Sequence, residues 1–139
     1  MFFTRVQAEP FDLGLEHARM ARTLAPAAGA IVSFVGQVRE APLFLEHYPA
    51  MAGRQLDALL ADARRRWPLL GAAAIHRYGP LAVGDPIVLV LTASAHRAAA
   101  FEAASFLMDW LKSSAPFWKK APEGWVEARA ADDEAAARW

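Results

Sequence analysis

The connections between the apolar segments of this chain are short, and this limits how the segments can be arranged. "AIVSFVGQVR", residues 30–39, is rich in β-branched and aromatic residues, and only three residues separate it from a second apolar run, "LFLEHY", at 43–48. Two further runs, "AAAIHRYG" at 72–79 and "PIVLVLTAS" at 86–94, are joined by "PLAVGD", whose Gly-Asp pair suits a turn. A crossover between parallel strands needs about a dozen residues or more, so these connections favour antiparallel neighbours.

Helical periodicity separates these predicted strands. Asp12 is a suitable N-cap for a helix that runs to about Leu24, and further helices are predicted at 50–67, 96–113 and 131–138. In the first of them one stripe contains Leu13, His17, Met20 and Leu24. Short strands are expected at 3–6 and 124–129. We therefore predict an α+β fold with a mostly antiparallel sheet and packed helices, and a single domain over residues 1–139.

Charge and cysteine content exclude several classes of function. Fifteen basic residues balance fifteen acidic ones, whereas a non-specific nucleic-acid binder usually carries a basic excess. No cysteine is present, so the chain has no thiolate metal site, no cysteine nucleophile and no persulfide carrier of its own. Its four histidines are scattered without metal-binding spacing, and we expect neither a metal nor a cofactor.

The chain gives no sign of a membrane or secretory protein. No apolar run approaches the roughly 18–20 residues of a membrane helix. The N-terminal stretch has no basic head followed by a long apolar segment, so we expect a cytoplasmic protein.

The stretch "MDWLKSSAPFWKK", residues 108–120, is the first candidate for chemistry. Lys112 lies four residues after Met108 and eleven after Phe101, so it extends the apolar stripe of the helix. Pro116 ends the helix, and the two aromatic residues that follow it can pin a connector that holds Lys119 near Lys112. Two cations held close together favour one neutral amine, able to act as a base or nucleophile. The alternative is a surface loop whose lysines reach into water.

The start of the same helix is the second candidate. In "TASAHRAAAF", Ser94 can act as the N-cap, which puts His96 and Arg97 in or beside the first turn. Free backbone N–H groups, an imidazole and a guanidinium together suit an oxyanion or a phosphate. The alternative is a solvated arginine beside a partly buried histidine.

A third candidate lies at the end of the strand predicted at 30–39. Strand alternation puts Arg39 on the same face as Gln37 and opposite to Phe34 and Val38. Gly36 allows another backbone or a ligand to come close. The alternative is an arginine at an ordinary surface strand end.

Several blocks, in this order, resemble one family. "GAIVSFVGQVR", "LEHYPAM", "ARRRWPL", "IHRYGPLAVGD", "TASAHRAAAFEAASFLMDWLK", "APFWKK" and "WVEAR" cover about residues 29–130. They are similar to the signature blocks of the large, catalytic subunit of molybdopterin synthase. The resemblance implies an α/β hammerhead-like fold.

The resemblance also implies an activity and a partner. Members of the family convert cyclic pyranopterin monophosphate to molybdopterin by installing two dithiolene sulfurs. The sulfur arrives as a thiocarboxylate on the C-terminal Gly-Gly of a small ubiquitin-like carrier subunit. The absence of cysteine fits this, because sulfur is then brought by the partner.

Site residues follow from the resemblance position by position. Lys112 and Lys119 match the catalytic lysines. The implied substrate-binding positions are Gln37, Val38, Arg39, His96, Arg97, Lys120 and Arg129, and the implied pocket walls are Phe34 and Met108. This sequence departs from the family at residues 40–43, where the loop is shorter than usual. The alternative function is a non-catalytic module on the same fold that binds a pterin, a phosphate or only the ubiquitin-like partner.

The implied site also predicts an assembly. His96 and Lys112 are sixteen positions apart on one predicted helix, or about 24 Å at the usual rise per residue. A small pterin phosphate cannot easily touch both ends. We therefore expect a homodimer in which each pocket takes residues from both chains, with one carrier at each outer end to give a heterotetramer.

Overall fold

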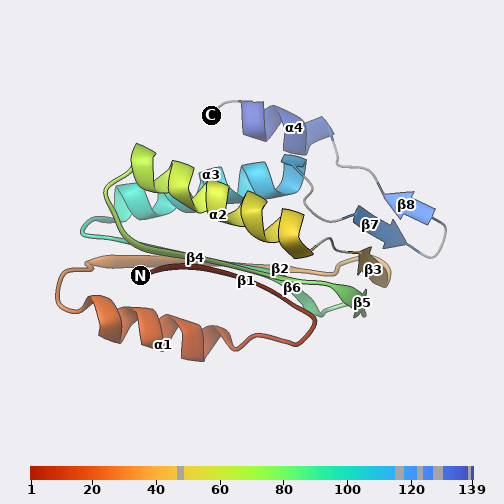
Figure 1. Ribbon diagram of the computed structural model, residues 1–139, viewed down its shortest axis with the longest axis horizontal. Helices are drawn as coiled ribbons and strands as arrows, with labels where there is room; N and C mark the ends of the chain where they lie inside the picture. The colour runs from red at the N-terminus through yellow and green to blue at the C-terminus, as the bar shows by residue number, and fades with distance from the viewer. Residues whose placement is uncertain (47–48, 115–117, 122–123, 127–129, 138) are drawn as a thin grey trace.

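The computed structural model describes residues 1–46, 49–114, 118–121, 124–126, 130–137 and 139. The elements, in chain order, are β1 (Phe2–Gln7), α1 (Leu13–Leu24), β2 (Ala30–Gln37), β3 (Leu43–Glu46), α2 (Pro49–Arg66), β4 (Leu69–Arg77), β5 (Gly79–Leu81), β6 (Pro86–Ser94), α3 (Arg97–Ser114), β7 (Trp118–Ala121), β8 (Gly124–Val126) and α4 (Ala130–Ala137). Figure 1 shows their arrangement.

The strands form two four-stranded sheets. The main sheet has the order β1-β4-β6-β2, and the second sheet has the order β5-β3-β7-β8. Only β1 and β4 pair in parallel among the described pairs; the others are antiparallel. The predicted α+β class and mostly antiparallel pairing are therefore confirmed.

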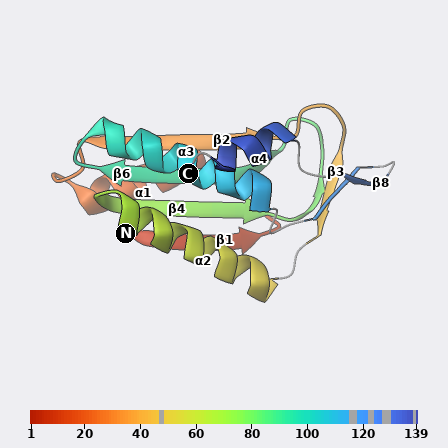
Figure 2. The ribbon, with the colours of Figure 1, turned by 90° about the horizontal axis from the view of Figure 1, so that it is seen from above.

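Helices cover both faces of the main sheet. In Figure 1, α2 and α3 lie on one face, α1 lies on the other, and α4 lies over α3. Figure 2 shows α3 running along β6 and β2, while α2 lies over the β1–β4 side. The central strands β4 and β6 are buried along nearly their whole length, because both of their faces are covered. This explains their near-continuous apolar sequences.

Three clusters of buried side chains hold the layers together. The largest lies between the main sheet and helices α2 and α3, and includes Leu56, Leu60, Val90, Phe106 and Leu107. A second, under α1, includes Met20, Ile75, Leu89 and Leu91. The third consists of Val38, Leu45, Leu81 and Ile87 and joins the two sheets.

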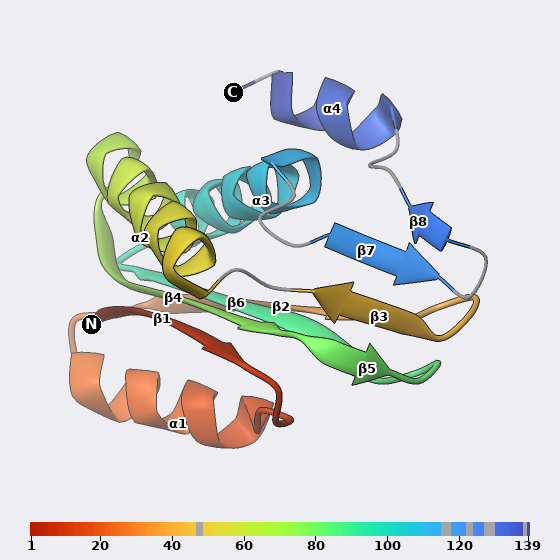
Figure 3. The same cartoon turned by 45° about the vertical axis from the view of Figure 1, so that its right-hand side comes forward.

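The second sheet differs from the sequence prediction. The runs at 30–39 and 43–48 were expected to be neighbours, but β3 pairs with β5 and β7 instead of β2 (Figure 3). Residues 118–121, predicted as part of a connector, form β7. The predicted connector is wrong at this point because the pairing that makes β7 a strand comes from residues more than seventy positions earlier.

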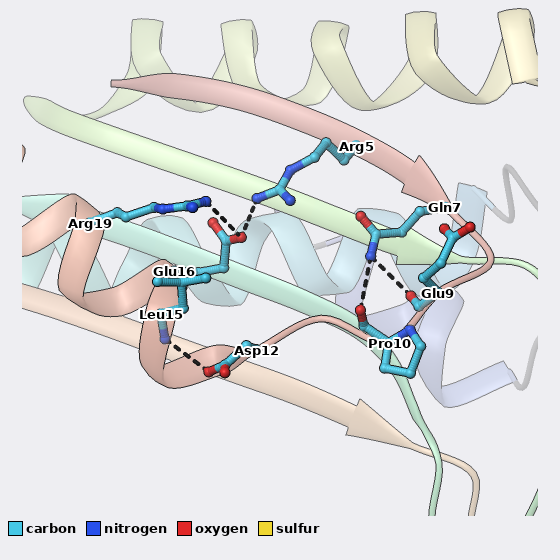
Figure 4. Close-up of polar contacts among 8 residues, drawn as sticks. All are labelled: Arg5, Gln7, Glu9, Pro10, Asp12, Leu15, Glu16 and Arg19. Carbon is cyan, nitrogen blue, oxygen red and sulfur yellow. Dashed lines mark hydrogen bonds and ion pairs between the residues drawn. The ribbon is translucent and has the colours of Figure 1, made fainter.

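Helix α1 is held to β1 by a buried carboxylate. Asp12 caps the helix as predicted, and its side chain accepts from Leu15 N at 2.9 Å. Glu16 is only 4% exposed and pairs with Arg5 of β1, with Arg19 3.9 Å away (Figure 4). The predicted apolar stripe is wrong in part: Leu13 and His17 are exposed, while Glu16 lies on the buried face because Arg5 pairs with it there.

No helix in the described parts of the chain is both long and apolar enough to span a membrane.

Candidate functional site

Helix α3 carries candidate residues at its two ends. His96 immediately precedes the helix and Arg97 is its first residue, and both are exposed. Lys112 lies in the last turn and is also exposed. At about 1.5 Å per residue, His96 and Lys112 are roughly 24 Å apart along the helix, so one chain does not bring them together.

The start of α3 is fixed differently from the sequence prediction. Ser94 is the last residue of β6, and its hydroxyl donates to the carbonyl oxygen of Pro68 at 2.8 Å. The predicted N-cap is therefore wrong: this hydroxyl joins β6 to the connection before β4. Thr92 helps to seat the helix, because its hydroxyl donates to the Ala100 carbonyl oxygen at 2.6 Å.

Lys112 directly follows a helix segment that packs into the core. Phe106, Leu107, Met108 and Leu111 all belong to the largest core cluster, and the next residue, Lys112, is exposed. The predicted stripe is uneven, because Met108 is only 9% exposed but Phe101 is 61% exposed. The backbone of an exposed lysine directly after a packed helix segment is fixed in place, while its amine remains in contact with solvent.

Strand β7 contains Lys119 and Lys120. It places their backbone at the end of the molecule where α3 ends with Lys112 in its last turn (Figure 1). Lys119 pairs with Leu45, and Lys120 pairs with Phe44. Only four positions separate Ser114, the end of α3, from Trp118, the start of β7, a step of at most about 14 Å. The predicted pinning role of Phe117 and the predicted site position Arg129 lie outside the described residues.

The end of β2 is irregular, and this changes the predicted faces. Phe34 pairs with Val90 and so lies on the face that α3 covers, where it remains 39% exposed. The register shifts between Gly36 and Gln37, and Val38 then turns into the core at 3% exposure. The expected alternation, with Phe34 and Val38 alike, is therefore wrong because the strand is interrupted between them.

Val38 and Gly36 both have packing roles in the structure. The Val38 N–H donates to Asp85 O at 3.0 Å, and its carbonyl oxygen accepts from Gly84 N at 2.8 Å. A Cβ at Gly36 would lie 2.9 Å from a methyl of Val88. Side chains therefore take up the space that the sequence suggested for a ligand or another backbone.

Arg39 and Gln37 are exposed next to this irregularity. Arg39 pairs with Glu40 at 2.9 Å, and both side chains are about two-thirds exposed, at 67% and 71%. A pair this exposed contributes about 0–1 kcal/mol, so Arg39 can exchange Glu40 for an anionic ligand at little cost.

A separate pocket lies away from these residues. It has a volume of about 180 Å³, lies between β1 and α2, and is lined by Phe2, Phe3, Asp57, Leu60, Ala61 and Arg64. Its polar groups already have partners, because Asp57 accepts from Thr4 and Arg64 lies 4.2 Å from the Phe2 ring.

Among the residues that the structure describes, no group of three or more His, Asp or Glu side chains could hold a metal ion.

Sequence reasoning missed two features of this region. Phe101 is the most exposed of the large apolar residues described, and it lies on the helix that flanks the open β2 edge. The strand β7 was the other: aromatic residues are enriched in strands, but the lysines and the alanine that follow Trp118 are depleted in them. The exposure of a side chain beside a sheet edge depends on tertiary packing, so the sequence carried no signal for the exposure of Phe101.

Comparison with known proteins gives consistent matches. The family model described as MoaE protein matches residues 6–114. The molybdopterin synthase catalytic subunit of Cereibacter sphaeroides is 50% identical, over 96% of this chain and 97% of that protein. A solved MoaE protein from Burkholderia ambifaria is 47% identical, with a TM-score of 0.88 over 100% of this chain and 98% of the other. A complex of subunits 1 and 2 of molybdopterin-converting factor from Helicobacter pylori shares the fold, with a TM-score of 0.73 at 21% identity over 91% and 90% of the two chains.

Proposed function

This chain belongs to the MoaE protein family, and from that membership we propose that it converts cyclic pyranopterin monophosphate to molybdopterin. The whole of residues 1–139 acts as one catalytic domain. Sulfur comes from the thiocarboxylated C-terminus of a small ubiquitin-like carrier subunit. The chain has no cysteine that could hold sulfur itself, which supports an external donor.

The observation that carries the proposed catalytic role is the placement of Lys112. Its helix segment is packed into the core up to Leu111, so the lysine side chain extends from a rigid part of the backbone. Lys112 and Lys119 act as the catalytic pair at the carrier's terminal carbonyl and at the substrate. The short step from α3 to β7 supports the pairing, because it keeps the two backbone segments near each other.

Both partners in this reaction are anions, and the other proposed residues suit them. The substrate carries a phosphate and the carrier ends in a thiocarboxylate. Arg39, His96, Arg97, Lys120 and Arg129 supply positive charge or N–H donors, and Gln37 supplies an amide. Phe34 and Met108 form the apolar walls, and Val38 takes part in substrate binding through shape alone, because its backbone groups are already paired.

An exposed apolar residue beside β7 suits the docking of the carrier. Phe44 is 45% exposed, and its backbone pairs with that of Lys120 in the second sheet. A ubiquitin-like partner that covers Phe44 would bury apolar area next to the lysines that its tail must reach.

Two copies of the chain complete each site. The midpoint between Arg97 and Lys112 falls at residues 104–105, on the same face of α3 as the exposed Phe101. If a two-fold axis passes there, the two α3 helices run antiparallel, and Arg97 of one copy meets Lys112 of the other. The exposed Phe101 and Phe34, which lie along α3 and the open β2 edge, would be covered by this contact. With a carrier at each outer end, the assembly is a heterotetramer.

A reconstituted reaction tests the function. The purified chain is incubated with cyclic pyranopterin monophosphate and a thiocarboxylated carrier, and the dithiolene product is measured. Product formation supports the synthase; tight carrier or pterin binding without product would favour the non-catalytic binding module instead. The shortened loop at residues 40–43 is the feature that favours this second candidate.

A truncated carrier separates docking from chemistry. Without its last two glycines the carrier should still bind, because the contact around Phe44 remains, but no sulfur should be transferred. Failure of the intact carrier to bind at micromolar concentration would contradict the proposed partner.

A further inference from the structure

Trp139 is held by four residues, three on helices α2 and α3 and one, Trp67, directly after α2. Its ring lies 5.6 Å from that of Trp67 and 5.9 Å from that of Phe106, in edge-to-face orientations of 80° and 88°. Its indole N–H donates to a carboxylate oxygen of Asp109. Its carbonyl oxygen accepts from Nη1 of Arg66 at 2.9 Å. Both the ring and the backbone of Trp139 are therefore fixed on α2 and α3.

This anchor supports the short helix α4. It has eight residues, whereas isolated helices shorter than about 12–15 residues are marginal in water. Among its side chains that the structure describes, residues 134–137, only Ala136 is buried. An alanine contributes little apolar area beside a tryptophan, which buries roughly 150–250 Å². Trp139 thus adds a large aromatic contact to the packing of α4 against α3.

The anchor closes a loop that contains the lysine-bearing strand. The chain leaves α3 after Ser114, forms β7 and β8, and returns along α4 to the same helix at Asp109. Asp109 is three residues before Lys112. Both ends of the loop that carries Lys119 are therefore attached to the helix that carries Lys112, as Figure 1 shows for the path from β7 through β8 to α4.

We propose that Trp139 is a positioning residue, which holds strand β7 against β3 so that Lys119 keeps its place relative to Lys112. The inference rests on the proposed function, because it takes these two lysines as the catalytic pair. Without the anchor, the segment that follows β7 is longer and more open, and its entropy opposes the described pairing of β7 with β3 and β8.

Hydrogen exchange on three full-length variants tests the structural step. Trp139→Ala removes the anchor, and Trp139→Phe keeps a ring against Trp67 and Phe106 but loses the N–H for Asp109. Phe2→Ala is the matched control, since Phe2 packs against the same core cluster from β1, on the far side from α4. In Trp139→Ala the β7 and α4 amides should exchange at least about tenfold faster than in Phe2→Ala, with β4 and β6 alike in both. Trp139→Phe should recover most of the protection.

Turnover in the reconstituted reaction tests the functional step. Trp139→Ala should lower kcat by about 10–100-fold with carrier affinity little changed, because small misplacements of reacting groups have effects of this size. Trp139→Phe should restore kcat, and Phe2→Ala should leave it near wild type. Equal β7 exchange in the Trp139→Ala and Phe2→Ala variants would overturn the inference, as would an opened β7 with normal kcat. If the wild-type chain makes no product, the proposed function fails, while the exchange result still decides whether Trp139 holds β7.

Discussion

Gly29 and Ala95 are so close that a Cβ at position 29 would lie 2.3 Å from the Ala95 carbonyl oxygen. The Gly29 N–H also donates to the Ser94 carbonyl oxygen at 3.1 Å. Ala95 begins the short turn that leads to His96 and Arg97. The lack of a side chain at Gly29 therefore sets the path of the backbone that presents these two cationic candidates.

Gly29→Ala should destabilise the protein and disturb this turn. The added methyl must push backbone, so we expect a loss of about 1–3 kcal/mol in the free energy of unfolding, typical of overpacking. Gly53→Ala is the control, because a Cβ in that part of α2 meets nothing within 4 Å. There the change should stabilise by about 0.5–1 kcal/mol through helix propensity. Urea unfolding of both variants measures the difference, and equal stability would contradict the close approach.

Arg5→Met should be costly because it leaves a buried carboxylate. Glu16 would keep only Arg19, 3.9 Å away, so we expect a loss of about 1–3 kcal/mol. The double variant Arg5→Met/Glu16→Leu should recover part of this loss, since it removes the buried charge as well. Arg19→Met is the control and should change stability little, because Arg19 is 52% exposed. The stabilities are measured by chemical denaturation. A double variant less stable than Arg5→Met would contradict the proposed role of the Arg5–Glu16 ion pair.

The helices could be predicted from the sequence, since their signals are local. Apolar periodicity placed α2, α3 and α4 within a residue of their observed ends, and Asp12 caps α1 as expected. The burial of Glu16 could not be foreseen in this way. Its partner Arg5 is on another element, and an acidic residue in a first helical turn usually faces water.

The second sheet and the site depend on contacts between distant segments. Strand β7 exists through its pairing with β3, and Val38 is buried through a register shift that a single sequence does not reveal. The candidate cations were found because their residue types suit anions, and the length of the predicted helix already indicated that its two ends are far apart in one chain. Helix length separates Arg97 from Lys112 within one chain, so how a second copy would bring them together depends on an interface that a single sequence does not contain.

Lys112→Ala should abolish turnover and leave the fold intact. The side chain is exposed, so its removal should change stability by no more than about 0.5 kcal/mol. Lys112→Arg should also fail, because a guanidinium stays protonated and cannot act as a base. Product formation and thermal unfolding, measured on the same samples, check both statements. Near-normal turnover in the arginine variant would remove the acid–base role.

If each site takes residues from two chains, two inactive variants should complement each other in a mixed dimer, which a monomeric enzyme could not do. Arg97→Ala and Lys112→Ala should each be inactive as homodimers, because each damages both pockets. In a mixed dimer, one pocket combines the intact Lys112 of the first chain with the intact Arg97 of the second, and the other pocket carries both changes.

Mixing the two inactive variants in equal amounts should therefore restore activity. Random exchange makes about half of the dimers mixed, each with one good pocket, so turnover should reach about a quarter of the wild-type value. Subunit exchange is followed independently with two differently tagged chains. As a control, Lys112→Ala mixed with a Lys119→Ala variant should recover nothing, because the two lysines serve the same pocket from one chain. Proven exchange without recovery in the Arg97/Lys112 mixture would show that the two ends of α3 serve separate functions.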